Sequence, residues 1–120
     1  MRSPQAFFLA LACAVAMVPA TGHAHAYLDH ASPRVGSVVS TSPSEVRLSF
    51  TQALEPRFTA AQLRSSSGAV VATGGVDPAN AKEIVIRVRA LAPGRYKVQW
   101  KVLSVDTHRT EGSFGFEVKP

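Results

Sequence analysis

The chain has 120 residues, a formal net charge of +5 from 13 Lys and Arg against 8 Asp and Glu, and one Cys. A single cysteine excludes an intrachain disulfide. The basic residues are spread from Arg34 to Lys119 rather than gathered into the stripe or motif of a nucleic-acid-binding protein. We therefore expect no nucleic-acid partner.

The first predicted element is an apolar run over residues 7–18, which follows Arg2 and precedes the helix-breaking Pro19. A basic start, a short apolar run and small residues after it are typical of a secretory signal peptide. The run is too short to cross a bilayer, which takes about 20 apolar residues. We expect residues 1–24 to be removed on export, which leaves residues 25–120 as one domain without a membrane anchor.

The sequence pattern alone does not decide where the signal peptide is cleaved. Small residues at positions −3 and −1 permit cleavage after Gly22, Ala24 or Ala26. Cleavage after Ala24 makes His25 the first residue, and cleavage after Gly22 makes it the third. Cleavage after Ala26 removes both His23 and His25.

The remainder of the chain reads as short strands between turns. Polar and apolar residues alternate with period two, as in half-buried antiparallel strands. Residues 60–63 fit a short helix or a strand, and the strand is the weaker prediction made for them. His30 lies in the apparent first strand. Turn signals separate the runs, among them Ser67-Gly68, Gly74-Gly75 and Asp77-Pro78. About seven strands predict an all-β Greek-key sandwich or barrel. The clearest alternating runs cover residues 45–50, 83–88, 94–104 and 112–118.

Two residues near the C-terminus form a candidate metal-binding pair, Asp106 and His108. In an extended chain, residues i and i+2 project from one face, roughly 6.5–7 Å apart at the backbone. Their side chains can then converge on one ion. An Asp-x-His pair alone is a weak signal, because a capped turn beside an exposed histidine gives the same pattern.

A histidine at the mature N-terminus strengthens that prediction. If cleavage follows Ala24, His25 offers both its α-amine and its imidazole to one metal. Together with Asp106 and His108 it makes a set of three nitrogens and one oxygen, which suits Cu(II), with Zn(II) and Ni(II) as competitors. His30 stands at odd separation from His25 and points to the opposite face of a regular strand.

Several motifs resemble the CopC-type periplasmic copper-binding proteins. The opening His25-Ala-Tyr-Leu-Asp-His-Ala-Ser-Pro33 is similar to that family's start. So are Glu45-Val-Arg-Leu-Ser-Phe50 and Leu91-Ala-Pro-Gly-Arg-Tyr-Lys-Val-Gln-Trp100. The chain ends on Ser104-Val-Asp-Thr-His108 and Gly112-Ser-Phe-Gly-Phe-Glu-Val118, like the family's "S-x-D-x-H" and "G-x-F-x-F-x-V".

The resemblance implies a cupredoxin-like or immunoglobulin-like barrel, cleavage before His25, and one Cu(II) per chain held by His25, Asp106 and His108. It further implies a periplasmic role in copper homeostasis or resistance. We expect no enzymatic activity, because Asp106 would occupy a coordination position that an oxidase keeps open and residues 25–120 leave little room for a substrate platform. Delivery of copper to an inner-membrane CopD-type protein extends that role. We expect a monomer.

One departure from the family concerns sulfur. Some members carry a second, Cu(I) site in a loop rich in Met and His, but residues 63–77 contain neither sulfur nor histidine. Cys13, Met1 and Met17 all precede residue 25. We therefore expect a protein that binds Cu(II) only. Two alternatives remain: a copper-dependent oxidase or monooxygenase with an N-terminal histidine brace, and a metal-free scaffold module.

Overall fold

The computed structural model describes residues 26–120, so the predicted signal peptide and His25 lie outside the described residues. The regular structure of the described part is almost all strand, which confirms the all-β prediction, with eight strands instead of about seven. One short 3-10 helix, η2 (Pro56–Phe58), interrupts them. The strands are β1 (Leu28–Ser32), β2 (Val38–Val39), β3 (Glu45–Phe50), β4 (Ala60–Ser65), β5 (Val70–Asp77), β6 (Asn80–Arg87), β7 (Gly94–Leu103) and β8 (Arg109–Val118).

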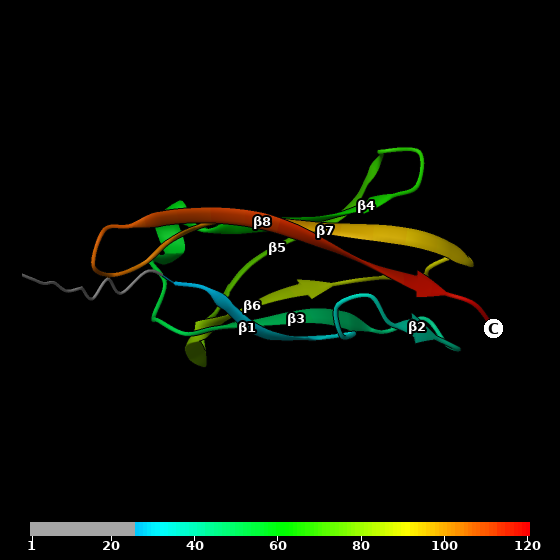
Figure 1. Ribbon diagram of the computed structural model, residues 1–120, viewed down its shortest axis with the longest axis horizontal. Coiled ribbons are helices and arrows are strands. Elements are labelled where there is room, and N and C mark those ends of the chain that lie inside the picture. Colours follow the sequence, from blue (N-terminus) through cyan, green and yellow to red (C-terminus); the bar gives the residue numbers. More distant parts are fainter. Residues whose placement is uncertain (1–25) are drawn as a thin grey trace, which may run out of the picture.

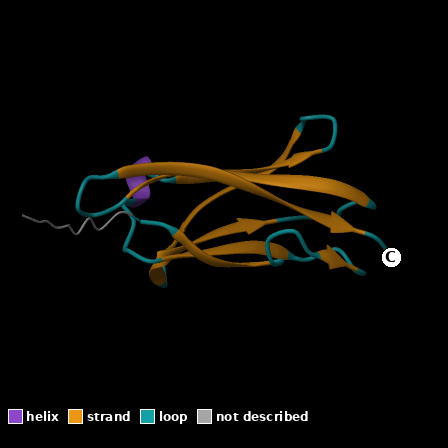
Figure 2. Cartoon of the chain, in the orientation of Figure 1, coloured by secondary structure: helices purple, strands orange, loops and turns teal. Residues whose placement is uncertain are grey.

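The strands form one curled sheet that folds over into a β-sandwich. Their order is β1-β3-β6-β5-β4-β7-β8-β2. In Figure 1, β4, β7 and β8 make the upper layer, while β1, β3 and β6 make the lower one. All neighbouring strands are antiparallel except β2 and β8. These two pair in parallel, Val39 opposite Val118, and β2 forms one edge of the sheet. The loops gather at the two ends of the sandwich (Figure 2).

Strand β5 joins the two layers, and the sequence did not reveal it. Its first half pairs with β4 and its second half with β6, so the chain changes layers in the middle of the strand. Gly74 and Gly75 lie at this crossing, and the turn predicted there is wrong. Gly74 approaches β6 so closely that a Cβ would stand 2.1 Å from the carbonyl oxygen of Val85. The glycine permits close backbone contact rather than a reversal of the chain.

The core lies between the layers and is built from the predicted alternating faces. Trp100 of β7 connects both layers, since its ring centroid lies 5.9 Å from that of Phe50 and 6.2 Å from that of Phe114. Aromatic pairs at such separations add to the stabilisation from burial. The buried apolar residues of the strands include Val46, Leu48, Phe50, Leu63, Ile84, Ile86, Tyr96, Val98, Val102, Phe114, Phe116 and Val118.

A cluster of ion pairs covers the outer face of the lower layer. The Arg47 guanidinium donates to Asp77 Oδ2 and to Glu83 Oε1, each at 2.7 Å, and to Glu45 Oε2 at 3.0 Å. The hydrogen bond from Arg47 holds the pKa of Asp77 below its ordinary value. The hydroxyl of Ser49, followed by Arg47, lowers the pKa of Glu83 in the same way.

Candidate metal centre

The predicted Asp-x-His pair lies in the five-residue loop between β7 and β8. The loop is closed by two backbone hydrogen bonds, from Ser104 N to His108 O at 2.9 Å and from Thr107 N to Ser104 O at 2.8 Å. Thr107 has a φ of 70°, a left-handed conformation that is uncommon for a non-glycine residue. The pair therefore sits on a tight turn, and the extended geometry expected from the sequence is wrong.

The turn nevertheless brings the two side chains together. His108 Nδ1 lies 3.3 Å from Asp106 Oδ1, and the two side chains are 47% and 34% exposed. The Ser104 hydroxyl donates to the same carboxylate, and this bond, followed by the contact with His108, lowers the pKa of Asp106. The carboxylate is therefore ionised at neutral pH and able to bind a cation.

Ser104 organises this loop, and the sequence reasoning gave it no role. Its side chain is fully buried. Besides the bond to Asp106, its hydroxyl oxygen accepts from the backbone N–H of His108 at 3.3 Å. Ser104 also forms an isolated bridge with the buried Leu54, and the next residue, Val105, donates to Ala53 O at 3.1 Å. The only signal in the sequence is the serine of the Ser-x-Asp-x-His motif.

The N-terminal segment is fixed at the same end of the sandwich, as Figure 1 shows. Ala26 is fully buried, and its carbonyl oxygen accepts a 2.7 Å hydrogen bond from the Thr110 hydroxyl. Tyr27 exchanges two further bonds with Thr51, at 2.9 and 3.0 Å. Thr110 follows His108 by two residues. Ala26 is thus tied to the start of β8, directly after the loop that carries the acid–histidine pair.

The other candidate residues lie elsewhere. His30 is exposed on β1, where its Nδ1 lies 2.9 Å from Asp29 Oδ2. Glu111 is exposed on β8 opposite Lys101 of β7. Within residues 26–120, no three His, Cys, Asp or Glu side chains cluster closely enough to hold a metal ion. Asp106 and His108 therefore supply two ligands at most, and a third must come from outside the described residues or from solvent.

Three exposed apolar side chains belong to this end of the molecule. Tyr27 is 59% exposed, Phe58 57% and Val105 52%. The Arg57 guanidinium lies 5.8 Å from the centroid of the Phe58 ring. Aromatic residues and arginine are enriched in protein–protein interfaces.

The fold and the geometry at this end define a small β-sandwich that presents an Asp–His pair close to Ala26, the first residue that the structure describes. The CopC domain model matches residues 28–119. The chain therefore belongs to the CopC family.

Relatives of known name and structure agree with this assignment. The copper resistance protein C of Pseudomonas syringae pv. tomato is 36% identical over an alignment 123 positions long, gaps included, that covers 93% of this chain and 94% of that protein. The crystal structure of CopC from Methylosinus trichosporium OB3b has a TM-score of 0.75 at 33% identity, covering 80% of this chain and 95% of that one. PcoC, a methionine-rich copper resistance protein from Escherichia coli, has a TM-score of 0.71 at 33% identity and covers 80% and 100%.

Proposed function

We propose that the protein binds one Cu(II) ion per chain through the α-amine and imidazole of His25, the Asp106 carboxylate and the His108 imidazole. The observation that carries the proposal is the hydrogen bond from Thr110 to Ala26, because it ties the residue next to His25 in the sequence to the start of β8, two residues after His108. The copper-resistance names of the relatives support the same metal. The proposal requires removal of residues 1–24, so that the amine of His25 is free.

The available donors fit cupric rather than cuprous ion. Nitrogen and carboxylate ligands suit Cu(II), whereas soft Cu(I) prefers thiolates and thioethers. Residues 26–120 contain no Cys and no Met, in contrast to the methionine-rich PcoC. We therefore expect Cu(I) to be bound weakly, so that reduction releases the metal.

The proposed role is copper homeostasis or resistance in the periplasm, without catalysis, and delivery of copper to a CopD-type membrane protein. The three exposed apolar residues Tyr27, Phe58 and Val105 support docking of a protein partner at the copper-binding end. A residue of the partner could then replace Asp106 or His108 at the metal without prior release of the ion into solvent.

A comparison of two chains tests the N-terminal ligation directly. One begins at His25, and the other carries a single glycine before His25. The added residue converts the α-amine of His25 into an amide, while every residue of the fold stays the same. We expect the extended chain to lose Cu(II) affinity strongly in a competition titration and to change its EPR spectrum.

Side-chain variants complete this test. Asp106→Ala and His108→Ala should each weaken Cu(II) binding, whereas His30→Ala is the matched control and should leave it unchanged. Equal affinity of the glycine-extended chain would disprove amine ligation. Retention of affinity in both loop variants would disprove the site.

A further inference from the structure

A second charged site lies on the outer face of the upper layer, toward the end opposite the β7–β8 loop. It is a crevice of about 310 Å³ beneath the β4–β5 hairpin. Three of its lining residues are cations, Arg64, Arg95 and Lys97, and none is a carboxylate. Lys97 and Ser104 are seven residues apart along extended chain, about 23 Å at 3.3 Å per residue. The crevice is therefore distinct from the candidate metal centre.

The strand register places like charges beside one another at this crevice. Arg64 of β4 is the direct cross-strand partner of Lys97 of β7. Like charges in that position are destabilising unless an anion lies between or above them. Of these cations, Arg95 has an acidic partner, since Glu117 Oε1 lies 3.9 Å from Arg95 Nε. This arrangement is costly for a structural role and suits an anionic ligand.

Arg64 is held in place for such a ligand. Its Nε donates to Gln99 Oε1 and its Nη1 to Gly68 O, each at 2.6 Å. These two bonds use two of the five N–H donors of a guanidinium, whose planar fork matches phosphate geometry. The hydroxyl-bearing Ser65 and Ser66 also line the crevice. A phosphate group would find both charge and hydrogen-bond donors there.

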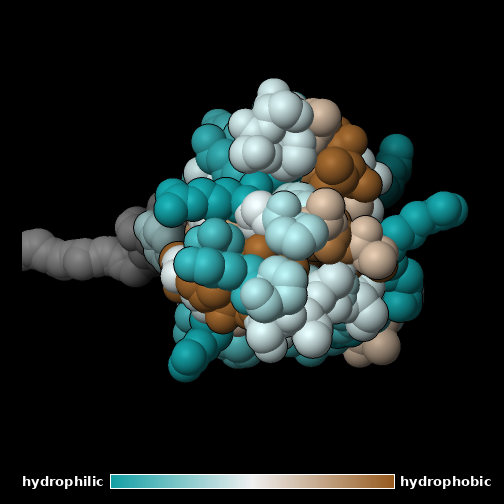
Figure 3. Space-filling model, turned by 90° about the vertical axis from the view of Figure 1, so that its right-hand side faces the viewer, coloured by the Kyte–Doolittle hydropathy of each residue, from teal (hydrophilic) through white to brown (hydrophobic). Residues whose placement is uncertain are grey.

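The hairpin above the crevice adds an apolar surface. Figure 1 shows it projecting away from the upper layer, and a register shift at Leu63/Arg64 accounts for the bend. Val70 and Val71, at the start of β5, are 45% and 46% exposed, and Val70 is the cross-strand partner of Arg64. In Figure 3, strongly apolar side chains lie beside hydrophilic ones on this end of the molecule.

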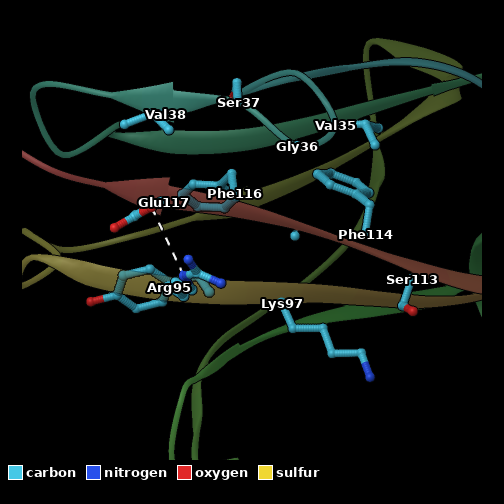
Figure 4. A pocket seen from close by; sticks show the side chains of 12 residues that line it. Val35, Gly36, Ser37, Val38, Arg95, Lys97, Ser113, Phe114, Phe116 and Glu117 are labelled. Carbon is cyan, nitrogen blue, oxygen red and sulfur yellow. Dashed lines mark ion pairs between the residues drawn. The ribbon is translucent and has the colours of Figure 1, made fainter.

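A neighbouring groove of about 630 Å³ shares two of these basic residues, Arg95 and Lys97. It runs between the loop at Val35 and Val38 and the aromatic face of β8. In the close view of Figure 4, Lys97 points away from these apolar side chains, whereas Arg95 is directed to Glu117. Arg95 and Lys97 therefore lie between two sets of exposed apolar residues. These are Val70 and Val71 on the hairpin, and Val35 and Val38 on the other side.

We propose that this crevice binds the phosphate of an anionic lipid headgroup and docks the protein reversibly on a membrane surface. A free phosphate ion would need only the cations, but the exposed valines on the hairpin favour an occupant with an apolar part. Basic residues beside apolar ones are the usual combination for binding at a lipid interface. The proposal is independent of the copper site.

Co-sedimentation with vesicles tests this proposal, using residues 25–120, because the apolar run of residues 7–18 would itself enter lipid. The CopC domain match, residues 28–119, lies wholly within this chain, so we expect it to fold on its own. We expect binding to vesicles of phosphatidylglycerol and phosphatidylcholine, weakened by added salt, and little binding to phosphatidylcholine alone. Each basic residue near an anionic surface contributes about fivefold in affinity.

Matched variants separate the crevice from net charge. Arg95→Gln with Lys97→Gln should weaken vesicle binding by about 25-fold. Arg57→Gln with Lys82→Gln removes the same charge elsewhere and should have little effect. Val70→Thr with Val71→Thr keeps the strand shape and should weaken binding at unchanged charge. Cu(II) affinity should be the same in all three variants, which keeps this test apart from the copper proposal.

Three results would overturn the proposal. The first is wild-type binding that does not depend on phosphatidylglycerol. The second is an equal loss in the Arg57/Lys82 control. The third is a lack of binding to vesicles combined with binding of another anion through Lys97. Binding of inorganic phosphate would assign the crevice to a small anion, and binding of poly-L-glutamate would assign it to an acidic protein segment.

Discussion

Replacing Ser104 by alanine should weaken both the fold and the proposed copper site. Ser104 is fully buried, and its hydroxyl contacts the Asp106 carboxylate and the backbone N–H of His108. Removing one partner of a buried hydrogen bond costs about 1–3 kcal/mol, so the free energy of unfolding should fall by that amount. Loss of a group that orients metal ligands typically lowers metal affinity about 10–100-fold.

The matched control is Ser49→Ala. Ser49 is likewise buried, at 8% exposure, and donates a 2.6 Å hydrogen bond to Glu83 Oε2 on the outer face of the lower layer. Urea denaturation of the metal-free proteins should show a comparable loss of stability for both variants. Competition titration should show weaker Cu(II) binding for Ser104→Ala alone. If Ser104→Ala loses stability but keeps wild-type copper affinity, Ser104 has no part in positioning the ligands.

Copper affinity should fall as the pH drops from about 8 to 6, because an α-amine with a pKa near 7.7–8.0 and two imidazoles must lose protons to bind the metal. Isothermal titration calorimetry at several pH values measures this affinity. An affinity that does not change with pH would contradict ligation by the amine. The pKa of Asp77 is lowered in the folded protein by Arg47. The ionised Asp77 carboxylate therefore stabilises the folded protein fully at pH values above its unfolded-state pKa near 4, and this stabilisation is lost as the pH falls toward its folded-state pKa. In Arg47→Met the pKa of Asp77 is no longer lowered by the arginine. The urea midpoint of this variant should therefore decrease less steeply than that of the wild type as the pH falls below about 4. Gly74→Ala would place a Cβ 2.1 Å from Val85 O. We expect urea denaturation to show a loss of about 1–3 kcal/mol or more in the free energy of unfolding. Gly75→Ala should cost less, because its Cβ would lie 3.9 Å from its nearest neighbour, the carbonyl oxygen of Thr59.

The strands that face the core on one side could be predicted from the sequence because their alternation is complete. Residues 45–50 were bounded correctly, and the weaker run at residues 60–63 is confirmed as part of β4. Strands β6 and β8 begin three residues earlier than predicted, since polar residues at their starts continue the backbone pairing without an apolar side chain to mark it. These first residues are strand because they pair with the neighbouring strand. The hydrophobic pattern of one segment carries no information about that partner.

Strand β5 escaped prediction for a related reason. Its residues Val70–Asp77 change from one layer to the other, so no face stays buried along its length and the apolar pattern is lost. The pair Gly74-Gly75 looks like a turn because glycine usually marks one. Here the need for glycine arises from the backbone of β6, which lies far away in the sequence.

The proximity of Asp106 and His108 could be predicted from the sequence, but the local geometry that produces it could not. Asp106 and His108 do lie together, yet a turn closed by Ser104 brings them there instead of an extended strand. The bond between Thr110 and Ala26 joins residues 84 positions apart, and no local signal marks it. The role of His25 remains a prediction, because it lies outside the described residues.

The position of Ala26 explains how a small domain without cysteine could hold a metal through its first residue. A chain terminus is ordinarily a poor ligand, because ordering the backbone of each free residue costs about 1–2 kcal/mol. Here the buried Ala26 already has its carbonyl bonded to Thr110, and Tyr27 is bonded to Thr51. The proposed site therefore depends on a proteolytic cut at one position: a chain that begins one residue earlier lacks the amine, and a chain that begins one residue later lacks the imidazole as well.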